Sequence, residues 1–128
     1  VYNCNEQFIQ SHKCKLFNDD ITCEKVMNET SPFVMKRLGS RVRNFAKEKL
    51  NTNAPIILKT WLTEKFSQNP KLKNKLLGTK NLTMAEASKE KPWGNGLSFS
   101  DPNVLDAEAW DNQGIMGEVL IQVRDLLK

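Results

Sequence analysis

Three of the five prolines in this chain stand where the sequence predicts that helices begin, and this pattern constrains the fold more than any other feature. Each follows a residue type that caps helix N-termini, in the segments Ser31-Pro32, Asn53-Ala54-Pro55 and Asn69-Pro70. Gly39 ends the helix predicted after Pro32, and Gly78 ends the helix predicted after Pro70, since glycine is common at helix C-termini. The stripe after Pro55 is the clearest, with apolar residues at helical spacing at Ile57, Leu58, Trp61, Leu62 and Phe66. The pattern predicts a mainly α-helical chain.

Further helices are expected on either side of these three. They cover about 5–17, a stretch capped by Asp19 or Asp20 that ends at Met27, about 41–50, and 113–127. Between residues 81 and 111 the helical pattern loosens into short extended pieces. There Leu82, Met84 and Glu86 are predicted to pair with Leu97 and Phe99 in a minor β-ribbon. The expected fold is a single compact helical domain over residues 1–128 with this small ribbon.

The length and composition of the chain indicate which classes of protein it can belong to. The 128 residues suit one domain with one core. No stretch approaches the ~20 apolar residues of a membrane span, and no membrane partner is expected. The net charge of +4 suits an anionic ligand, yet the lysines are scattered, and those from 71 to 80 alternate with leucines as on a solvated helix face. Binding to nucleic acid is therefore a secondary hypothesis on charge alone.

The cysteines point to a reducing environment. Cys4, Cys14 and Cys23 are odd in number and lack C-x-x-C spacing, and His12 is the only histidine. A structural zinc site would need four ligands in a recognisable spacing. We therefore interpret the cysteines as reduced thiols in a cytoplasmic protein, and expect neither a metal nor a cofactor.

A first candidate for chemistry lies on the first predicted helix. Glu6, Gln10 and Lys13 stand at i, i+4 and i+7, so they project from one helix face, whereas His12 points away from it. A carboxylate and an ammonium two turns apart can frame a pocket, one activating water and the other holding a phosphate. The alternative is an ordinary solvated stripe, and spacing alone favours that alternative.

A second candidate lies in the last third of the chain, where tryptophans occur beside glycines. Trp93-Gly94 and Trp110 precede the last predicted helix, and Glu90 lies three residues before Trp93. An aromatic floor at a helix N-terminus suits a phosphorylated nucleoside or sugar. Two carboxylates near such a surface suit hydrolysis of a glycosidic bond through an oxocarbenium-like transition state. The alternative is that both tryptophans anchor loops to the core.

An ordered set of short motifs over nearly the whole chain resembles the NADAR family, the YbiA-like N-glycosidases. The set contains Asn5-Glu6-Gln7-Phe8-Ile9-Gln10 with Lys13, Ser31-Pro32 with Arg37-Leu38-Gly39, Lys65-Phe66 through Thr79, Glu86-Ala87-Ser88, Trp93-Gly94 with Gly96-Leu97, Trp110, and Leu120 with Val123-Arg124. Each motif is short, and the specificity lies in their order.

This resemblance implies an α-rich hydrolase that cleaves N-glycosidic bonds of ribosyl phosphates, without a metal. The substrates it implies are riboflavin-pathway intermediates or ADP-ribosylated guanine in nucleic acid, and the style of the motifs favours the latter. It implies Glu6, Lys13 and Glu90 as catalytic residues, with Glu6 activating water or stabilising the ribosyl cation. It implies substrate contacts from Gln10, Trp93, Gly94, Trp110 and Asn112.

Three departures from the family pattern leave an alternative open. Glu90 stands where the family has Asp, and Gly114 stands where it has Asn, with Asn112 two residues earlier. The family's usual N-terminal segment does not precede Val1, so we expect an excised domain or a member without that segment. The alternative is a degenerate module that binds ADP-ribose or another nucleotide without hydrolysis. A helical interaction domain with purely architectural tryptophans is a third hypothesis.

Overall fold

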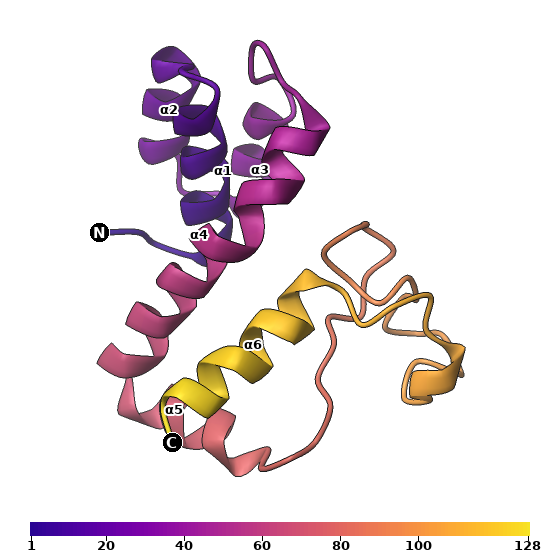
Figure 1. The fold of residues 1–128 in the computed structure, drawn as a ribbon. Coiled ribbons are helices and arrows are strands. Elements are labelled where there is room, and N and C mark those ends of the chain that lie inside the picture. Colours follow the sequence, from indigo (N-terminus) through magenta and orange to yellow (C-terminus); the bar gives the residue numbers. More distant parts are fainter. The chain divides into compact units, whose positions relative to one another are not determined.

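The computed structural model describes residues 1–128, which form helices and loops without any β-strand. The helices are α1 (Asn5–Leu16), α2 (Asp20–Met27), α3 (Pro32–Gly39), α4 (Lys47–Gln68), α5 (Pro70–Gly78), the short 3₁₀ helix η1 (Ala107–Ala109) and α6 (Ile115–Leu126) (Figure 1). The prediction of a mainly α-helical chain is confirmed. The chain divides into two compact units, Val1–Ala54 and Pro55–Lys128, with the division inside α4. The expectation of a single domain stays a prediction.

In the first unit, α1, α2 and α3 pack against one another. Their shared core contains the buried side chains of Cys14, Phe17, Val26, Met35 and Val42. Capping fixes where two of these helices begin, because the Asp19 carboxylate accepts the backbone N–H of Thr22 and the Ser31 hydroxyl accepts that of Val34. The starts and ends predicted for these helices from Asp19, Ser31-Pro32 and Gly39 match the structure.

In the second unit, α6 is tied to the segment that follows α5. The buried Arg124 guanidinium donates from Nη1 to the Thr79 hydroxyl at 3.0 Å and to the Leu82 carbonyl at 2.8 Å. Gly117 lies against the backbone of Met84 and Ala85, where a β-carbon would overlap it. Side-chain bonding at one end of α6 and close backbone approach at the other hold the loop from 79 to 85 along this helix.

The prediction that Pro55 begins a helix is wrong, and so is the separate helix expected at 41–50. Residues 41–46 form turns, and α4 runs without a break from Lys47 past Pro55, which lies in its interior. Proline removes one helical hydrogen bond there. Asn53 was predicted to cap the helix. Its side-chain Nδ2 instead donates a hydrogen bond of 2.7 Å to the Lys49 carbonyl. The start signal therefore lay inside a longer helix.

The predicted β-ribbon is also absent. Two backbone bonds do join the two stretches, from Asn95 N–H to the Glu86 carbonyl and from Gly96 N–H to the Ser88 carbonyl, both at 2.9 Å. The chain then leaves this register at Gly96, which adopts a positive φ of 88°. Leu82 and Phe99, which were expected inside the ribbon, are exposed.

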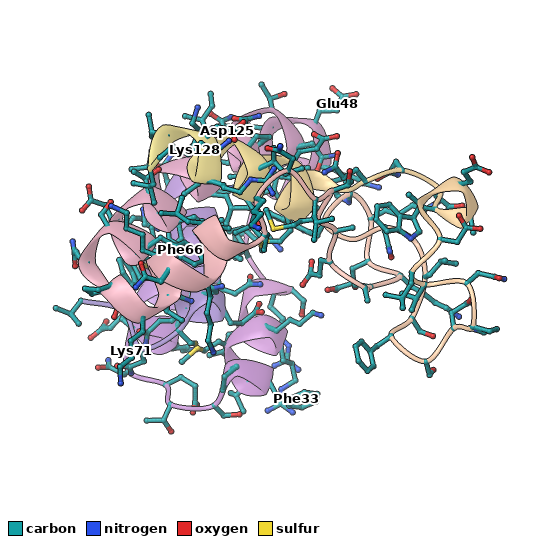
Figure 2. The ribbon with its side chains drawn as sticks, turned by 90° about the horizontal axis from the view of Figure 1, so that it is seen from below. Phe33, Glu48, Phe66, Lys71, Asp125 and Lys128 are labelled. Atoms are coloured by element: carbon teal, nitrogen blue, oxygen red, sulfur yellow. The ribbon has the colours of Figure 1, made fainter.

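The surface carries many charged side chains (Figure 2), and several large apolar side chains are also exposed. Lys128 and Asp125 form an ion pair of 3.1 Å at the end of α6, and Phe33 on α3 is 74% exposed. None of the helices combines the length and the apolar composition that crossing a lipid bilayer requires.

Candidate functional site

The candidate residues form two groups, one in each unit. Glu6, Gln10 and Lys13 belong to the first unit and are called the α1 face below. Glu90, Trp93, Gly94, Trp110 and Asn112 belong to the second unit, within residues 86–114, which are called the tryptophan loop below.

On the α1 face, Glu6 and Gln10 are in direct contact. Gln10 Nε2 donates a hydrogen bond of 2.7 Å to Glu6 Oε1, as their i, i+4 spacing allows. Gln10 is buried and Glu6 half-buried. The carboxylate therefore has a fixed donor on one oxygen. A carboxylate held in this way is oriented before any ligand arrives, unlike the side chains of a solvated stripe.

Lys13 lies one turn further along the same helix face and is half-buried. Its Nζ is 4.6 Å from the centre of the Phe45 ring, a cation–π distance. Burial lowers the pKa of Lys13, while the nearby Cys14 and Glu6 partly oppose that shift. The α1 face thus combines an oriented carboxylate with an amine that loses its proton more readily than an exposed lysine.

The other polar residues of α1 serve the fold. Gln7 is buried and donates from Nε2 to the carbonyls of Val26, Met27 and Glu29, which ties α1 to the end of α2. The His12 ring is half-buried against Phe8, with ring centres 3.9 Å apart. Its position off the α1 face agrees with the sequence prediction.

In the tryptophan loop, backbone atoms do most of the bonding. Gly94 lies against Ser88, whose carbonyl oxygen is 2.5 Å from the place of a β-carbon, so its α-carbon faces protein backbone. The Trp110 indole N–H donates to the Val104 carbonyl at 2.8 Å, which closes the loop between them. Trp93 is half-buried, and Glu90 and Asn112 are exposed. These positions give Gly94 and Trp110 architectural contacts, and for Trp110 the contact is of the kind expected in the alternative that the tryptophans anchor loops.

The N-terminus of α6 is occupied by the chain itself. The N–H groups of Ile115 and Met116 donate to the carbonyls of Pro92 and Trp93, at 3.0 and 3.2 Å. The sequence prediction of a phosphate receptor at this helix start is therefore wrong for these two amides, because carbonyls of the chain already accept their hydrogen bonds.

Asn95 is a residue that the sequence analysis missed. It is 1% exposed, its side-chain oxygen accepts the Leu97 N–H at 3.1 Å, and its backbone bonds to both Glu86 and Asp111. Its place between two glycines was the available signal, since a polar residue in such a turn tends to bond to nearby backbone.

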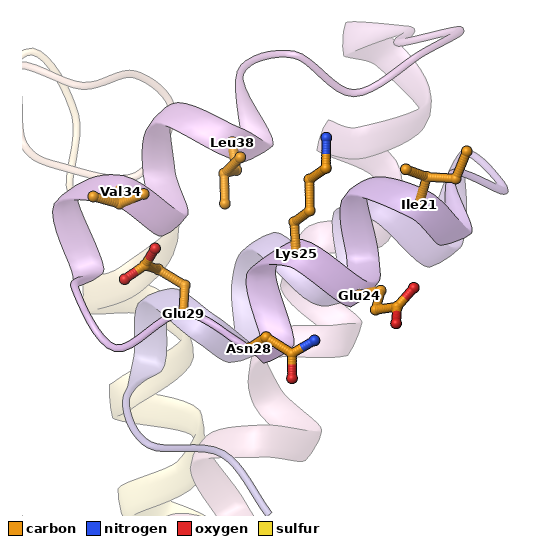
Figure 3. A pocket seen from close by; sticks show the side chains of 7 residues that line it. All are labelled: Ile21, Glu24, Lys25, Asn28, Glu29, Val34 and Leu38. Carbon is orange, nitrogen blue, oxygen red and sulfur yellow. The ribbon is translucent and has the colours of Figure 1, made fainter.

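A groove of about 530 Å³ also lies in the first unit, between α2 and α3 (Figure 3). It is lined by Ile21, Glu24, Lys25, Asn28, Glu29, Val34 and Leu38. None of these side chains is a candidate residue, and their charges are mixed in sign. The groove therefore adds no residue to the candidate site.

Comparison with known proteins identifies the family of this chain. A family model described as the NADAR domain matches residues 1–128. The chain belongs to the NADAR domain family. Two curated relatives match almost all of it. One is the N-glycosidase R617 of Acanthamoeba polyphaga mimivirus, 35% identical over 97% of this chain and 74% of the viral protein. The other is Protein irg-1 of Caenorhabditis elegans, 34% identical over 98% of this chain and 61% of the nematode protein.

Within this NADAR domain, the glycine at position 114 has a structural cause. Gly114 has a φ of 81°, and a β-carbon there would lie 2.6 Å from the Gly94 carbonyl oxygen. The same atom would also overlap the Trp93 carbonyl. The motif resemblance expects asparagine at this position. In this chain, the backbone of the tryptophan loop fills the space that an asparagine side chain would need.

Proposed function

We propose that this NADAR domain is an N-glycosidase, a hydrolase of the bond between a ribosyl carbon and a nitrogenous base. The observation that carries the proposal is the Glu6 carboxylate, held by the buried Gln10 amide at 2.7 Å with Lys13 on the same helix face. Membership of the NADAR family and similarity to a protein named N-glycosidase support a glycosidase-type activity.

The proposed chemistry follows from the charge that develops when the glycosidic bond breaks. The ribosyl carbon becomes oxocarbenium-like, and a carboxylate close to it stabilises that charge or takes a proton from the attacking water. Glu6 performs this role in the proposal. Lys13, whose burial lowers its pKa, binds an anionic group of the substrate as ammonium or assists departure of the base.

The remaining roles in the proposal fall on the tryptophan loop. Glu90 is the second carboxylate, and Trp93 and Trp110 offer aromatic surfaces for the substrate, with Gly94 and Asn112 beside them. Gln10 acts through Glu6. The proposed substrate carries an ADP-ribosyl or ribosyl-phosphate group, with ADP-ribosylated guanine favoured over riboflavin-pathway intermediates. The reaction needs no metal, and a cytoplasmic location fits the three free cysteines.

The test is to incubate the purified chain with ADP-ribosylated guanosine and, separately, with a ribosylaminopyrimidine phosphate, each with and without a chelator. Mass spectrometry then follows the two products of each cleavage, guanosine with ADP-ribose or the free pyrimidine with ribose phosphate. Release of guanosine that the chelator leaves unchanged supports the proposal and its substrate. Release only from the pyrimidine compound moves the substrate to the riboflavin pathway, and loss of release with the chelator overturns metal independence.

The binding module is an explicit outcome of the same experiment. If no base is released from either compound but ADP-ribose raises the melting temperature, the domain is a degenerate binder. If neither release nor a thermal shift occurs, the proposal fails and a helical interaction domain becomes the better account.

A further inference from the structure

The Gln10 side chain has an unusual environment for a buried amide. It is 8% exposed, and its Nε2 donates to Glu6 at 2.7 Å. Its Oε1 has no hydrogen-bond partner, although it is buried. A buried acceptor without a partner costs free energy, so its position calls for a physical reason.

The reason lies on the neighbouring helix, at Gly39. The Gln10 amide occupies the volume that a β-carbon on residue 39 would take, and Gln10 Cγ is 3.1 Å from that point. Gly39 is the last residue of α3, which packs directly on α1, and it is buried. Only glycine leaves room for the amide here. The amide oxygen therefore rests against the α-carbon of Gly39, and the amide nitrogen faces the carboxylate of Glu6.

We propose that Gln10 is a positioning residue for Glu6, and that Gly39 is the residue of α3 that locks Gln10 in place. This inference rests on the proposed function, in which Glu6 acts on the ribosyl carbon. It changes the role of Gln10 from a substrate contact to a group that orients the catalytic carboxylate. Misplacement of a catalytic group by about 1 Å can lower a rate by about 100-fold, so the lock has a measurable consequence.

The first experiment tests whether Gly39 holds the Gln10 side chain in place, and it needs no substrate. The side-chain amide resonance of Gln10 is assigned by its loss in Gln10→Met and followed by NMR in Gly39→Ala. We expect the resonance to move and its exchange with water to accelerate, because the new methyl group displaces the amide. An unchanged resonance in a folded Gly39→Ala protein would overturn the proposal.

The matched control is Gly78→Ala. Gly78 is likewise the last residue of a helix that begins with proline, but nothing lies within 4 Å of the place of its β-carbon. We expect the Gln10 resonance and the activity to stay as in the wild type. If Gly78→Ala moves the resonance as much as Gly39→Ala does, the effect is not local to the contact and the proposal fails.

The second experiment is a double-mutant cycle on N-glycosidase turnover. We expect Gln10→Met, which keeps the length but removes the donor, to lower kcat about 10- to 100-fold with little change in KM. Gly39→Ala should lower kcat to a similar extent. In a Gln10→Ala background, Gly39→Ala should have no further effect, because the side chain that it displaces is gone.

Full additivity of Gly39→Ala and Gln10→Ala would overturn the proposal, since Gly39 would then act through another contact. Wild-type kcat in Gln10→Met would overturn the positioning role directly. If the wild-type chain releases no base, the proposed function has failed, and the NMR experiment still decides whether Gly39 locks Gln10. The two failures are therefore distinguishable.

Discussion

The α1 face and the tryptophan loop are built in different ways. On the α1 face, helical spacing and one side-chain hydrogen bond bring Glu6 and Gln10 together, with Lys13 one turn away. In the tryptophan loop, most hydrogen bonds are accepted by backbone carbonyls, including the bond from the Trp110 indole N–H, and glycines pack closely against neighbouring atoms. A side chain on the α1 face can be exchanged without moving the backbone. In the loop, a side chain added at Gly94 or Gly114 overlaps the backbone itself.

This difference predicts which measurements respond in each region. Substitutions on the α1 face should change turnover far more than stability, because their bonds join side chains. Substitutions at Gly94 and Gly114 should change stability first, because a β-carbon overlaps backbone atoms there.

The largest expected effect comes from Glu6→Gln. The exchange preserves size and removes the charge, so turnover should fall about 10²- to 10⁴-fold while the melting temperature stays close to that of the wild type. Product release followed by mass spectrometry and thermal unfolding of the same sample check both parts. A parental rate of turnover would remove Glu6 from the proposed mechanism.

Gly114→Ala should produce the largest change in stability. Its φ of 81° strains any other residue, and the new methyl group overlaps the Trp93 and Gly94 carbonyls. The free energy of unfolding should fall by at least about 1–3 kcal/mol, as for a residue forced into a rare backbone region. Urea denaturation measures it, and Gly78→Ala is the control with open space around its β-carbon. Equal stability of the two variants would refute the tight backbone packing at Gly114.

Acid should destabilise the first unit through Asp19. The Arg43 backbone N–H, followed by the Thr22 side chain and backbone, lowers the pKa of Asp19 to about 2. An unfolded aspartate has a pKa of about 3.9. Because the folded pKa is the lower one, the stabilisation is complete above about pH 4 and is lost as the pH falls towards about 2.

Asp19→Asn should therefore flatten the dependence of the unfolding free energy on pH over that window. Denaturant unfolding at a series of pH values measures the slope, with Asp20→Asn as a neighbouring control. A slope unchanged in Asp19→Asn but reduced in Asp20→Asn would contradict the assignment.

The smallest expected effect comes from Trp110→Phe. The substitution keeps an aromatic ring but removes the N–H that donates to the Val104 carbonyl at 2.8 Å. Stability should fall by about 0.5–1.5 kcal/mol, the usual contribution of one such hydrogen bond. Turnover should change little, because the aromatic ring that the proposal offers to the substrate is kept. A large fall in turnover would instead show that the indole N–H itself acts on the substrate.

The helices α1, α2 and α3 were predictable because their signals are local. Caps at Asp19 and Ser31, and the glycine at 39, fix helix ends through contacts within a few residues. The face shared by Glu6 and Gln10 was also predictable, since helical spacing alone puts them side by side. The packing of Gly39 against Gln10 was not, because it joins two helices.

The errors have a common physical source in contacts that span longer stretches of chain. The residues around Pro55 have the local pattern of a helix start, yet the helix that contains Pro55 begins at Lys47. The ribbon failed because Gly94 and Gly96 pack against Ser88 and Asp111 instead of continuing a ladder. The alternation of apolar residues in 82–99 carried no information about these approaches.

The most direct test of the account is a reaction of the wild-type chain with ADP-ribosylated guanosine in water enriched in oxygen-18. Hydrolysis at the ribosyl carbon predicts oxygen-18 in the released ADP-ribose and none in the released guanosine. Unlabelled ADP-ribose incubated alongside corrects for slow exchange at that carbon. Release of guanosine with no label in ADP-ribose above this control would contradict attack by water, and no release would contradict the glycosidase itself.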